Sequence, residues 1–302
     1  MAGGSHPMRA ILYALFANFG IAIAKTWAAF VTGSSSMTAE AIHSYADTGN
    51  QVLLLIGLQR SKRPPDDEHP LGYGKATYVW SFIVAILLFS IGGLFSLYEG
   101  WHKLHATEPI QNAWIALSVL AVSIALEAVS MRGCLVEVRK ELRGRSLWRW
   151  TRESRSSELI VVFGEDLAAL LGLAMAFAFV GIASTTGDPR YDAYGSIAVG
   201  SLLVVIAIFV AIRVKSLLIG RSADPDIQAA ISSAIAYEPN VAEVFNVITV
   251  QVGPQVMLAA KLRIADGVSL RDAIDTVNRL EVRLKREIPE IGWCFVETDV
   301  AD

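Results

Sequence analysis

The chain has 302 residues, of which 53% are hydrophobic and only 18% charged, and its formal net charge is −3. Soluble globular domains carry about 25% charged residues, so this composition favours a membrane protein. The small negative charge provides no basic field and argues against nucleic-acid binding. Two isolated cysteines, Cys134 and Cys294, exclude a disulfide framework and a thiolate zinc finger.

Six stretches of the first 216 residues are candidates for membrane spans, each of which needs roughly 20 mostly apolar residues. Two of the six are uncharged, and the other four contain one or a few polar residues. We therefore expect a six-helix transmembrane domain over residues 1–216. The spans are expected at Met8–Phe30, Met37–Leu58, Ala76–Leu97, Asn112–Met131, Leu159–Ser184 and Ser196–Ile212, the last extended by Tyr194 and Gly195.

Lysine and arginine gather in the loops after the second and fourth spans. Cytoplasmic loops carry an excess of these residues, and the number of spans is even, so we expect both the N- and C-termini in the cytoplasm. The compact loops and short tail favour a bacterial inner membrane. The basic residues are Arg60, Lys62, Arg63 and Lys75 in the first of these loops, and Arg132, Arg139, Lys140, Arg143, Arg145, Arg149, Arg152 and Arg155 in the second.

The tail, residues 217–302, has no apolar run long enough to cross a bilayer. Asp224-Pro225 is typical of a helix start, and Ser269 precedes an amphipathic helix that reaches about Glu287. We expect a cytoplasmic α/β domain in the order helix, strand, strand, helix, strand. Its small size predicts pairing with a second copy. The strands are expected at Val241–Gln251, Val256–Ile264 and Trp293–Thr298, the first two joined by a Gly253-Pro254 turn.

Ionisable residues inside the spans are the candidates for a functional site, because a charge within a bilayer is costly. His43 and Asp47 stand at i and i+4 of the second span, so they share one helix face and are able to bind one divalent cation. The alternative is a polar contact between helices. Glu165 and Asp166 are adjacent in the fifth span, where a cation between the two spans would offset their repulsion. Here the alternative is a protonated Glu165 with Asp166 alone as a ligand.

Several motifs together resemble the cation diffusion facilitator family, and the likeness covers nearly the whole chain. They are His43-x-x-x-Asp47, the fifth-span Asp166, the loop Pro65-Asp-Asp-Glu-His69-Pro-Leu-Gly72-Tyr-Gly74-Lys75, and Asp188-Pro-Arg-Tyr-Asp192-Ala-x-Gly-Ser196, with Asn18 and Lys25 in the first span. The resemblance implies a homodimer of six-span subunits with a ferredoxin-like cytoplasmic domain. Such proteins export zinc or related divalent ions, usually against protons.

The resemblance also implies a metal site formed by the second and fifth spans. His43, Asp47 and Asp166 match three of the family's four ligand positions, whereas the fourth, a histidine in the family, is Val162 here. Glu165 is the available replacement and indicates a divergent subgroup. One nitrogen and three oxygen ligands favour Zn²⁺ as the transported substrate and leave Mn²⁺, Fe²⁺ and Co²⁺ open.

Two further metal sites of the family are expected to be weak or absent. In the loop after the second span, Asp66 and His69 are in place, but Tyr73 replaces the third ligand, a histidine. The cytoplasmic site of the family relies on histidines, and none of the five histidines lies beyond residue 216. The corresponding tail positions are Gln251, Lys261, Glu297 and Asp299.

Two remaining intramembrane charges, Lys25 and Glu127, are not expected to be ligands. Lys25 lies near the outer end of its span, which favours a side chain that snorkels to the interface. We place Glu127 near the inner interface.

These patterns predict a transporter that exports a divalent cation from the cytoplasm, with protons as the exchanged ion and the lipid bilayer as its surroundings. One alternative is a membrane scaffold or metal-responsive receptor that acts through its cytoplasmic domain. A second, an intramembrane metalloenzyme, lacks the HExxH signature that it would need.

Overall fold

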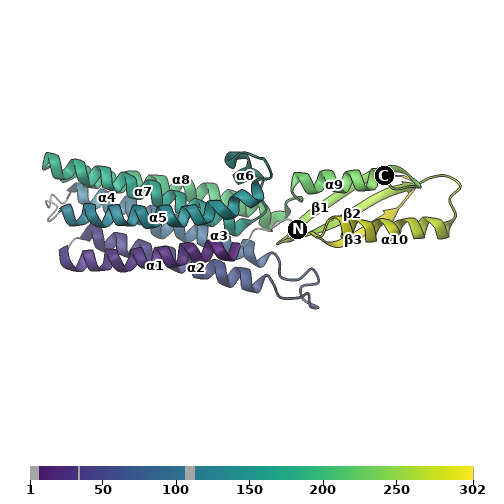
Figure 1. The fold of residues 1–302 in the computed structure, drawn as a ribbon, viewed down its shortest axis with the longest axis horizontal. Coiled ribbons are helices and arrows are strands. Elements are labelled where there is room, and N and C mark those ends of the chain that lie inside the picture. The colour runs from purple at the N-terminus through teal and green to yellow at the C-terminus, as the bar shows by residue number, and fades with distance from the viewer. Residues whose placement is uncertain (1–6, 33–34, 106–112, 302) are drawn as a thin grey trace. The chain divides into compact units, whose positions relative to one another are not determined.

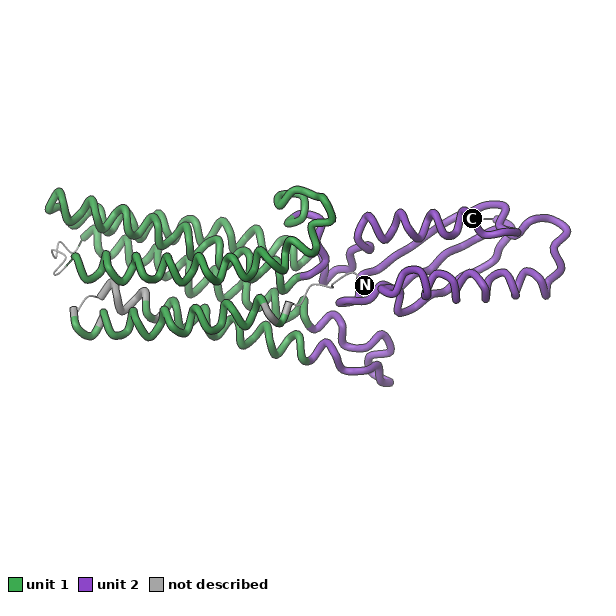
Figure 2. Tube along the Cα trace, viewed as in Figure 1, with its two compact units in different colours: residues 1–59, 77–151, 157–215 green, residues 60–76, 152–156, 216–302 purple. Residues whose placement is uncertain are grey.

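The computed structural model describes residues 7–32, 35–105 and 113–301, and within them the chain forms two compact units. The first unit contains residues 1–59, 77–151 and 157–215, and the second contains residues 60–76, 152–156 and 216–302 (Figure 2). The second unit therefore combines the tail with two loop segments that lie far from it in the sequence.

Long helices that run alongside one another make up the first unit (Figure 1). The third expected span is interrupted by a π-helical turn, η1, between α3 and α4. A short helix, α6, lies between the fourth and fifth expected spans. The bounds are α1 Pro7–Thr32, α2 Ser35–Arg60, α3 Ala76–Leu87, η1 Leu88–Leu94, α4 Phe95–His105, α5 Ala113–Leu142, α6 Leu147–Glu153, α7 Ser157–Thr186 and α8 Arg190–Gly220.

Within the described residues, five helical stretches are long and apolar enough to cross a membrane. They correspond to the first, third, fourth, fifth and sixth expected spans, although Asn112, the expected start of the fourth, lies outside the described residues. The second expected span is α2, whose 26 residues extend about 39 Å and are long enough to cross. Its polar residues keep it out of this apolar group. The prediction of a helical membrane protein is confirmed.

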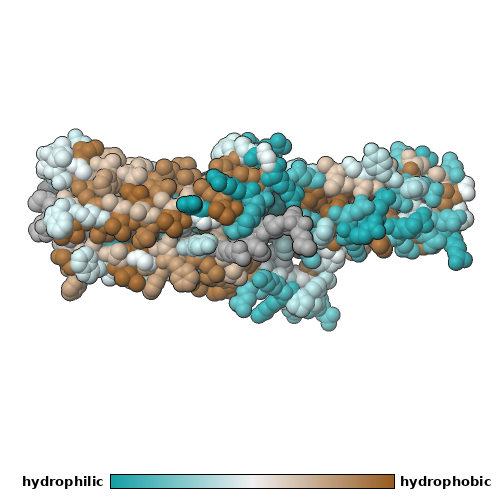
Figure 3. Space-filling view, viewed as in Figure 1, coloured by the Kyte–Doolittle hydropathy of each residue, from teal (hydrophilic) through white to brown (hydrophobic). Residues whose placement is uncertain are grey.

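The surface of the first unit is mostly hydrophobic in the view of Figure 3, whereas that of the second is mostly hydrophilic. Large apolar side chains on the outer faces of the helices are exposed, which in water would be unfavourable over so wide an area. Lipid is the surrounding that makes such a surface stable. The exposed residues include Phe16, Trp27, Phe30, Trp114, Val129 and Val205.

Glycines let α8 approach the third span closely. A Cβ atom at Gly200 would lie 2.8 Å from the Leu97 backbone nitrogen, and one at Gly93 would lie 2.7 Å from the Val204 side chain. Close backbone approach through small residues is the usual way in which helices associate in lipid. A cluster of buried apolar side chains from η1, α7 and α8 packs at this contact. It contains Leu88, Ala168, Val199, Leu203 and Ala207.

The tail has the order that the sequence predicts. It comprises α9 Pro225–Ala236, β1 Val241–Val252, β2 Gln255–Ile264, α10 Leu270–Glu287 and β3 Ile291–Thr298. The strand β2 is central, antiparallel to β1 and parallel to β3. Asp224 caps α9 by accepting a hydrogen bond from the Asp226 backbone, and Ser269 caps α10 in the same way through Asp272. The α/β fold class and the position of each expected strand are confirmed.

The helices α9 and α10 cover one face of the sheet. Ile231 and Ile235 of α9 and Leu280 and Leu284 of α10 are fully buried, together with Leu258 of β2. Two arginines connect this domain to the segment 152–156. Arg155 donates to the carbonyl oxygens of Ser222 and Ala223, and Arg221 donates to that of Arg152.

Candidate metal-binding site

The second-span pair predicted from the sequence is formed. His43 Nε2 lies 3.5 Å from Asp47 Oδ2, because residues four apart on a helix project from the same face. Both side chains are mostly enclosed, with 18% and 11% of their surface exposed. A neutral imidazole nitrogen and a carboxylate oxygen at this separation are able to bind the same cation.

The π-helical turn η1 lies against this pair. Gly92 faces His43 so closely that a Cβ atom there would lie 3.1 Å from the imidazole Cε1. Insertions of this kind into α-helices occur frequently at functional sites. The turn and its glycine together leave the space that the imidazole occupies.

Glu165 is held by two side-chain amides from α2. Asn50 Nδ2 donates to Glu165 Oε1 and Gln51 Nε2 donates to Glu165 Oε2, each over 2.8 Å. Asn18 Nδ2 of α1 donates in turn to Gln51 Oε1 over 3.3 Å. These buried groups, which we call the amide clamp (Asn18, Asn50, Gln51 and Glu165), connect α1, α2 and α7.

Asp166 has a different surrounding from its neighbour. Ser130 Oγ of α5 donates to Asp166 Oδ2 over 3.2 Å. Asp166 Oδ1 is buried and has no hydrogen-bond partner within the residues that the structure describes. A buried carboxylate oxygen normally has a partner, so this atom is available to a cation. Asp47 interacts electrostatically with both Glu165 and Asp166.

Lys25 and Glu127 line the same small cavity as His43 and Asp47. Lys25 is 2% exposed and Glu127 is 1% exposed, and the charges of the two interact. The prediction that Lys25 snorkels is therefore wrong, because its side chain is enclosed by protein and not by lipid. Glu127 lines this cavity together with His43 and Asp47, and its placement near the inner interface stays a prediction.

The four predicted ligands are not equally close to one another. His43 and Asp47 form a direct pair, whereas Glu165 is bound by the amide clamp and Asp166 by Ser130. Across residues 7–32, 35–105 and 113–301, no three His, Cys, Asp or Glu side chains are close enough together to hold a metal ion. A four-ligand site would therefore require the acids of α7 to move relative to α2.

The comparison with known proteins identifies the family. The cation efflux transmembrane domain matches residues 11–219. The chain belongs to the cation efflux family, the cation diffusion facilitators. This confirms the resemblance seen in the sequence.

Several relatives have names that describe a transport activity. The chain is 38% identical over 224 residues to the Xenopus laevis proton-coupled zinc antiporter SLC30A9, mitochondrial, which covers 74% of this chain and 40% of that protein. It is 33% identical over 249 residues to the human protein of the same name, covering 82% and 44%. It is 36% identical over 221 residues to Arabidopsis thaliana metal tolerance protein C4, covering 72% and 48%. The chain thus spans less than half the length of these relatives.

The loop position at which the family resemblance implies a second site has a different role here. Tyr73 donates its hydroxyl to Asp66 Oδ2 over 2.7 Å, and the His69 backbone donates to Asp66 Oδ1 over 2.7 Å. The hydrogen bond from Tyr73 lowers the pKa of Asp66 below its ordinary value. Both carboxylate oxygens are therefore already engaged by the protein.

Two of the tail positions that correspond to the family's cytoplasmic metal site form an ion pair in the structure. Lys261 Nζ lies 2.9 Å from Asp299 Oδ2. The hydrogen bond from Lys261 lowers the pKa of Asp299. The buried Gln251 donates to the Gly253 carbonyl and closes the turn between β1 and β2.

Sequence reasoning missed the amide clamp, although a signal for it exists. Gln51 continues the i, i+4 spacing of His43 and Asp47, so these three residues lie on one face of α2. An amide on that face predicts a buried acceptor on a neighbouring helix. The roles of Ser130 and Gly92 have no comparable signal in the sequence.

Proposed function

We propose that the protein exports a divalent cation, most directly Zn²⁺, from the cytoplasm in exchange for protons. The proposal is carried by the His43–Asp47 pair, which lines a cavity of the helical unit. Asp166 of α7, which interacts electrostatically with Asp47, adds a buried carboxylate oxygen that has no hydrogen-bond partner among the described residues. Relatives named as proton-coupled zinc antiporters support the choice of ion. Mn²⁺, Fe²⁺ and Co²⁺ suit the same oxygen-rich ligand set.

The proposed ligands are His43, Asp47, Asp166 and Glu165. In the state described above, the amide clamp supplies Glu165 with two hydrogen bonds that a cation would have to replace. Asp166 needs no such exchange at Oδ1. We therefore assign His43, Asp47 and Asp166 as the first ligands to engage, and Glu165 as the last.

Proton exchange follows from the chemistry of these ligands. Carboxylate and imidazole bind a metal only when deprotonated, so metal and protons compete for the same atoms. Protons that enter from the outer side would release the cation and prepare the site for its return. The expected orientation, with both termini cytoplasmic in a bacterial inner membrane, makes this movement an export.

The test is metal and proton flux in proteoliposomes with Zn²⁺, Mn²⁺, Fe²⁺ and Co²⁺ supplied in turn. The wild type should move at least one ion, with opposite proton movement, and Asp47→Ala or Asp166→Ala should abolish that flux. Asp275→Asn is the matched control because Asp275 is an exposed carboxylate of α10. Flux that survives in both alanine variants would refute the ligand assignment, whereas no wild-type flux with any ion would favour a scaffold or receptor.

We also propose that the protein is a homodimer formed partly by the tail. Ile248, Ala259 and Phe295 are register partners across the three strands and lie on the face opposite the helices. Ile248 and Phe295 are 51% and 57% exposed. A row of apolar side chains on an uncovered sheet face is suited to a second copy. Phe295→Glu should shift the mass in light scattering from dimer toward monomer, and an unchanged mass would oppose this contact.

A further inference from the structure

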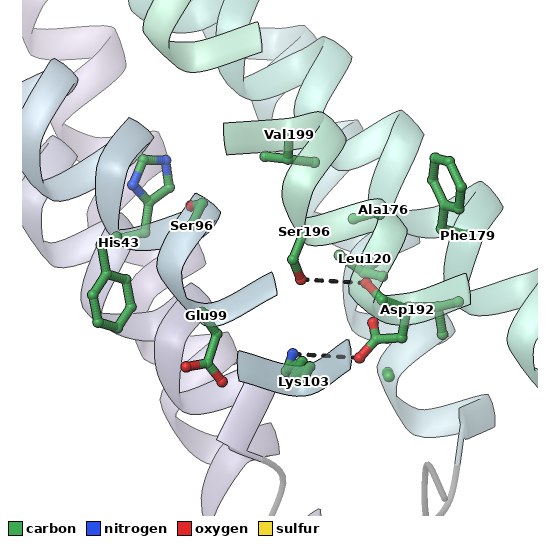
Figure 4. A pocket seen from close by; sticks show the side chains of 14 residues that line it. His43, Ser96, Glu99, Lys103, Leu120, Ala176, Phe179, Asp192, Ser196 and Val199 are labelled. Atoms are coloured by element: carbon green, nitrogen blue, oxygen red, sulfur yellow. Dashed lines mark hydrogen bonds and ion pairs between the residues drawn. The ribbon is translucent and has the colours of Figure 1, made fainter. Parts of the chain in front are cut away.

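A second cavity of the helical unit extends from His43 toward the end of the bundle where α4 ends and α8 begins (Figure 4). On α4 it is lined by positions 95, 96, 99 and 103, and on α8 by positions 192, 195, 196 and 199. Each set follows the spacing of one helix face. From Gly92, beside His43, to Lys103 is eleven residues of helix, or about 16 Å. The residues that line the cavity therefore extend from His43 along α4 and α8 to these helix ends.

Three charged residues line this cavity at the end away from His43. Lys103 Nζ is 3.3 Å from Asp192 Oδ2, and both side chains are 16% exposed. Glu99, one turn before Lys103 on α4, lines the same cavity. Figure 4 shows the three side chains between the ends of α4 and α8, with Ser196 bonded to the Asp192 backbone.

We propose that Glu99, Lys103 and Asp192 form an electrostatic gate through which the divalent cation passes between the His43–Asp47 pair and the outer side. We call this set the exit triad. The proposal rests on the proposed transport function and adds residues outside the metal-binding pair.

The physical basis is the charge of the exit triad. Two carboxylates and one ammonium give it a formal charge of −1, which attracts a divalent cation. Because the ammonium of Lys103 is paired with Asp192, it limits how strongly the cation is bound. Charges of one sign at the mouth of a cavity raise the local concentration of the opposite ion. Because Lys103 is largely enclosed, its field is screened less than that of a surface lysine.

The charge of the exit triad predicts opposite effects for two substitutions. Lys103→Met makes the formal charge −2, so the exit should hold Zn²⁺ more tightly and zinc on the outer side should oppose export more strongly. Glu99→Gln makes the charge 0, so zinc on the outer side should inhibit export less strongly. The maximal rate of zinc export should also fall several-fold.

The measurement is zinc uptake by everted membrane vesicles, in which the outer side faces the lumen, preloaded with increasing Zn²⁺. We expect Lys103→Met to lower the half-inhibitory lumenal zinc about tenfold and Glu99→Gln to raise it by a similar factor. Lys103→Arg, which retains the charge, and His102→Gln, an exposed residue of α4 outside the cavity, should match the wild type.

Equilibrium zinc binding to the solubilised protein separates this inference from the proposed function. In both variants the tightest phase of equilibrium zinc binding, which belongs to the central pair, should stay as in the wild type, because neither residue is a ligand of that pair. If the wild type transports zinc but both variants have its half-inhibitory lumenal zinc concentration, the exit triad is refuted and the transport function is not. Should Lys103→Met fail to fold, Glu99→Gln decides, since Glu99 is outside the Lys103–Asp192 ion pair. Absence of wild-type flux would instead refute the transport function.

Discussion

Asn50 and Glu165 are 115 positions apart in the sequence, and their side chains meet over 2.8 Å between Asn50 Nδ2 and Glu165 Oε1. The second oxygen of Glu165 is bound by Gln51. The carboxylate therefore has an amide donor on each oxygen, which fixes the position of α7 relative to α2. Asp166, the next residue, instead accepts a hydrogen bond from Ser130 of α5.

Removing an amide of the clamp should destabilise the helical unit. Gln51→Ala would leave Glu165 Oε2 and Asn18 without their bond to Gln51, and a buried group that loses its partner costs about 1–3 kcal/mol. Thermal unfolding in detergent should show a lower midpoint than in the wild type. Thr48→Ala on the same helix is the matched control, because the Thr48 hydroxyl donates to the Ser44 carbonyl oxygen of α2 itself. Equal midpoints for Gln51→Ala and the wild type would show that the clamp contributes no stability.

A side chain at Gly92 should disturb His43. Gly92→Val would place methyl groups closer than the 3.1 Å already reached by a Cβ atom, and would displace the imidazole from Asp47. We expect zinc affinity to fall at least tenfold, measured by equilibrium binding. Gly181→Val in α7 is the control, because a Cβ atom there meets nothing within 4 Å. If Gly92→Val binds zinc with wild-type affinity, η1 does not influence the metal site.

The enclosed ammonium of Lys25 should compensate the acids of its cavity when no metal is bound. Lys25→Met would remove the positive charge that interacts with Glu127, and a buried acid that loses a compensating charge is destabilised. The metal-free protein should unfold at a lower temperature, and added Zn²⁺ should recover more stability than in the wild type. The double variant Lys25→Met/Glu127→Gln should regain part of the loss, and no recovery would oppose a direct interaction of the two residues.

The ion pair between Lys261 and Asp299 should make the tail sensitive to acid. Lys261 lowers the pKa of Asp299, so this contribution to stability is present above the ordinary carboxyl pKa and is lost as the pH falls through the lowered value. Lys261→Met should destabilise residues 217–302 slightly at pH 7, and the difference from the wild type should vanish near pH 2. Circular dichroism melts of this fragment across the pH range provide the measurement, and a difference that persists at pH 2 would assign the effect to packing.

Much of the architecture could be predicted from local patterns. Long apolar runs predicted the helices of the first unit, and the capping residues Asp224 and Ser269 predicted the starts of α9 and α10. These signals are local in sequence, because a span or a cap depends on neighbouring residues. The pairing of His43 with Asp47 was equally accessible, since the helical repeat alone brings them together.

The sequence by itself therefore determined a helical membrane protein, its α/β tail and the family's motifs. Only the tertiary structure decided what each polar side chain contacts. Lys25 is enclosed in a cavity that Glu127 also lines, and Lys103 pairs with Asp192 in the cavity that His43 also lines. Contacts of this kind depend on how each helix is rotated about its axis and on glycines that set the approach of its neighbours. Rotation and approach result from packing across the whole bundle, which local periodicity does not specify.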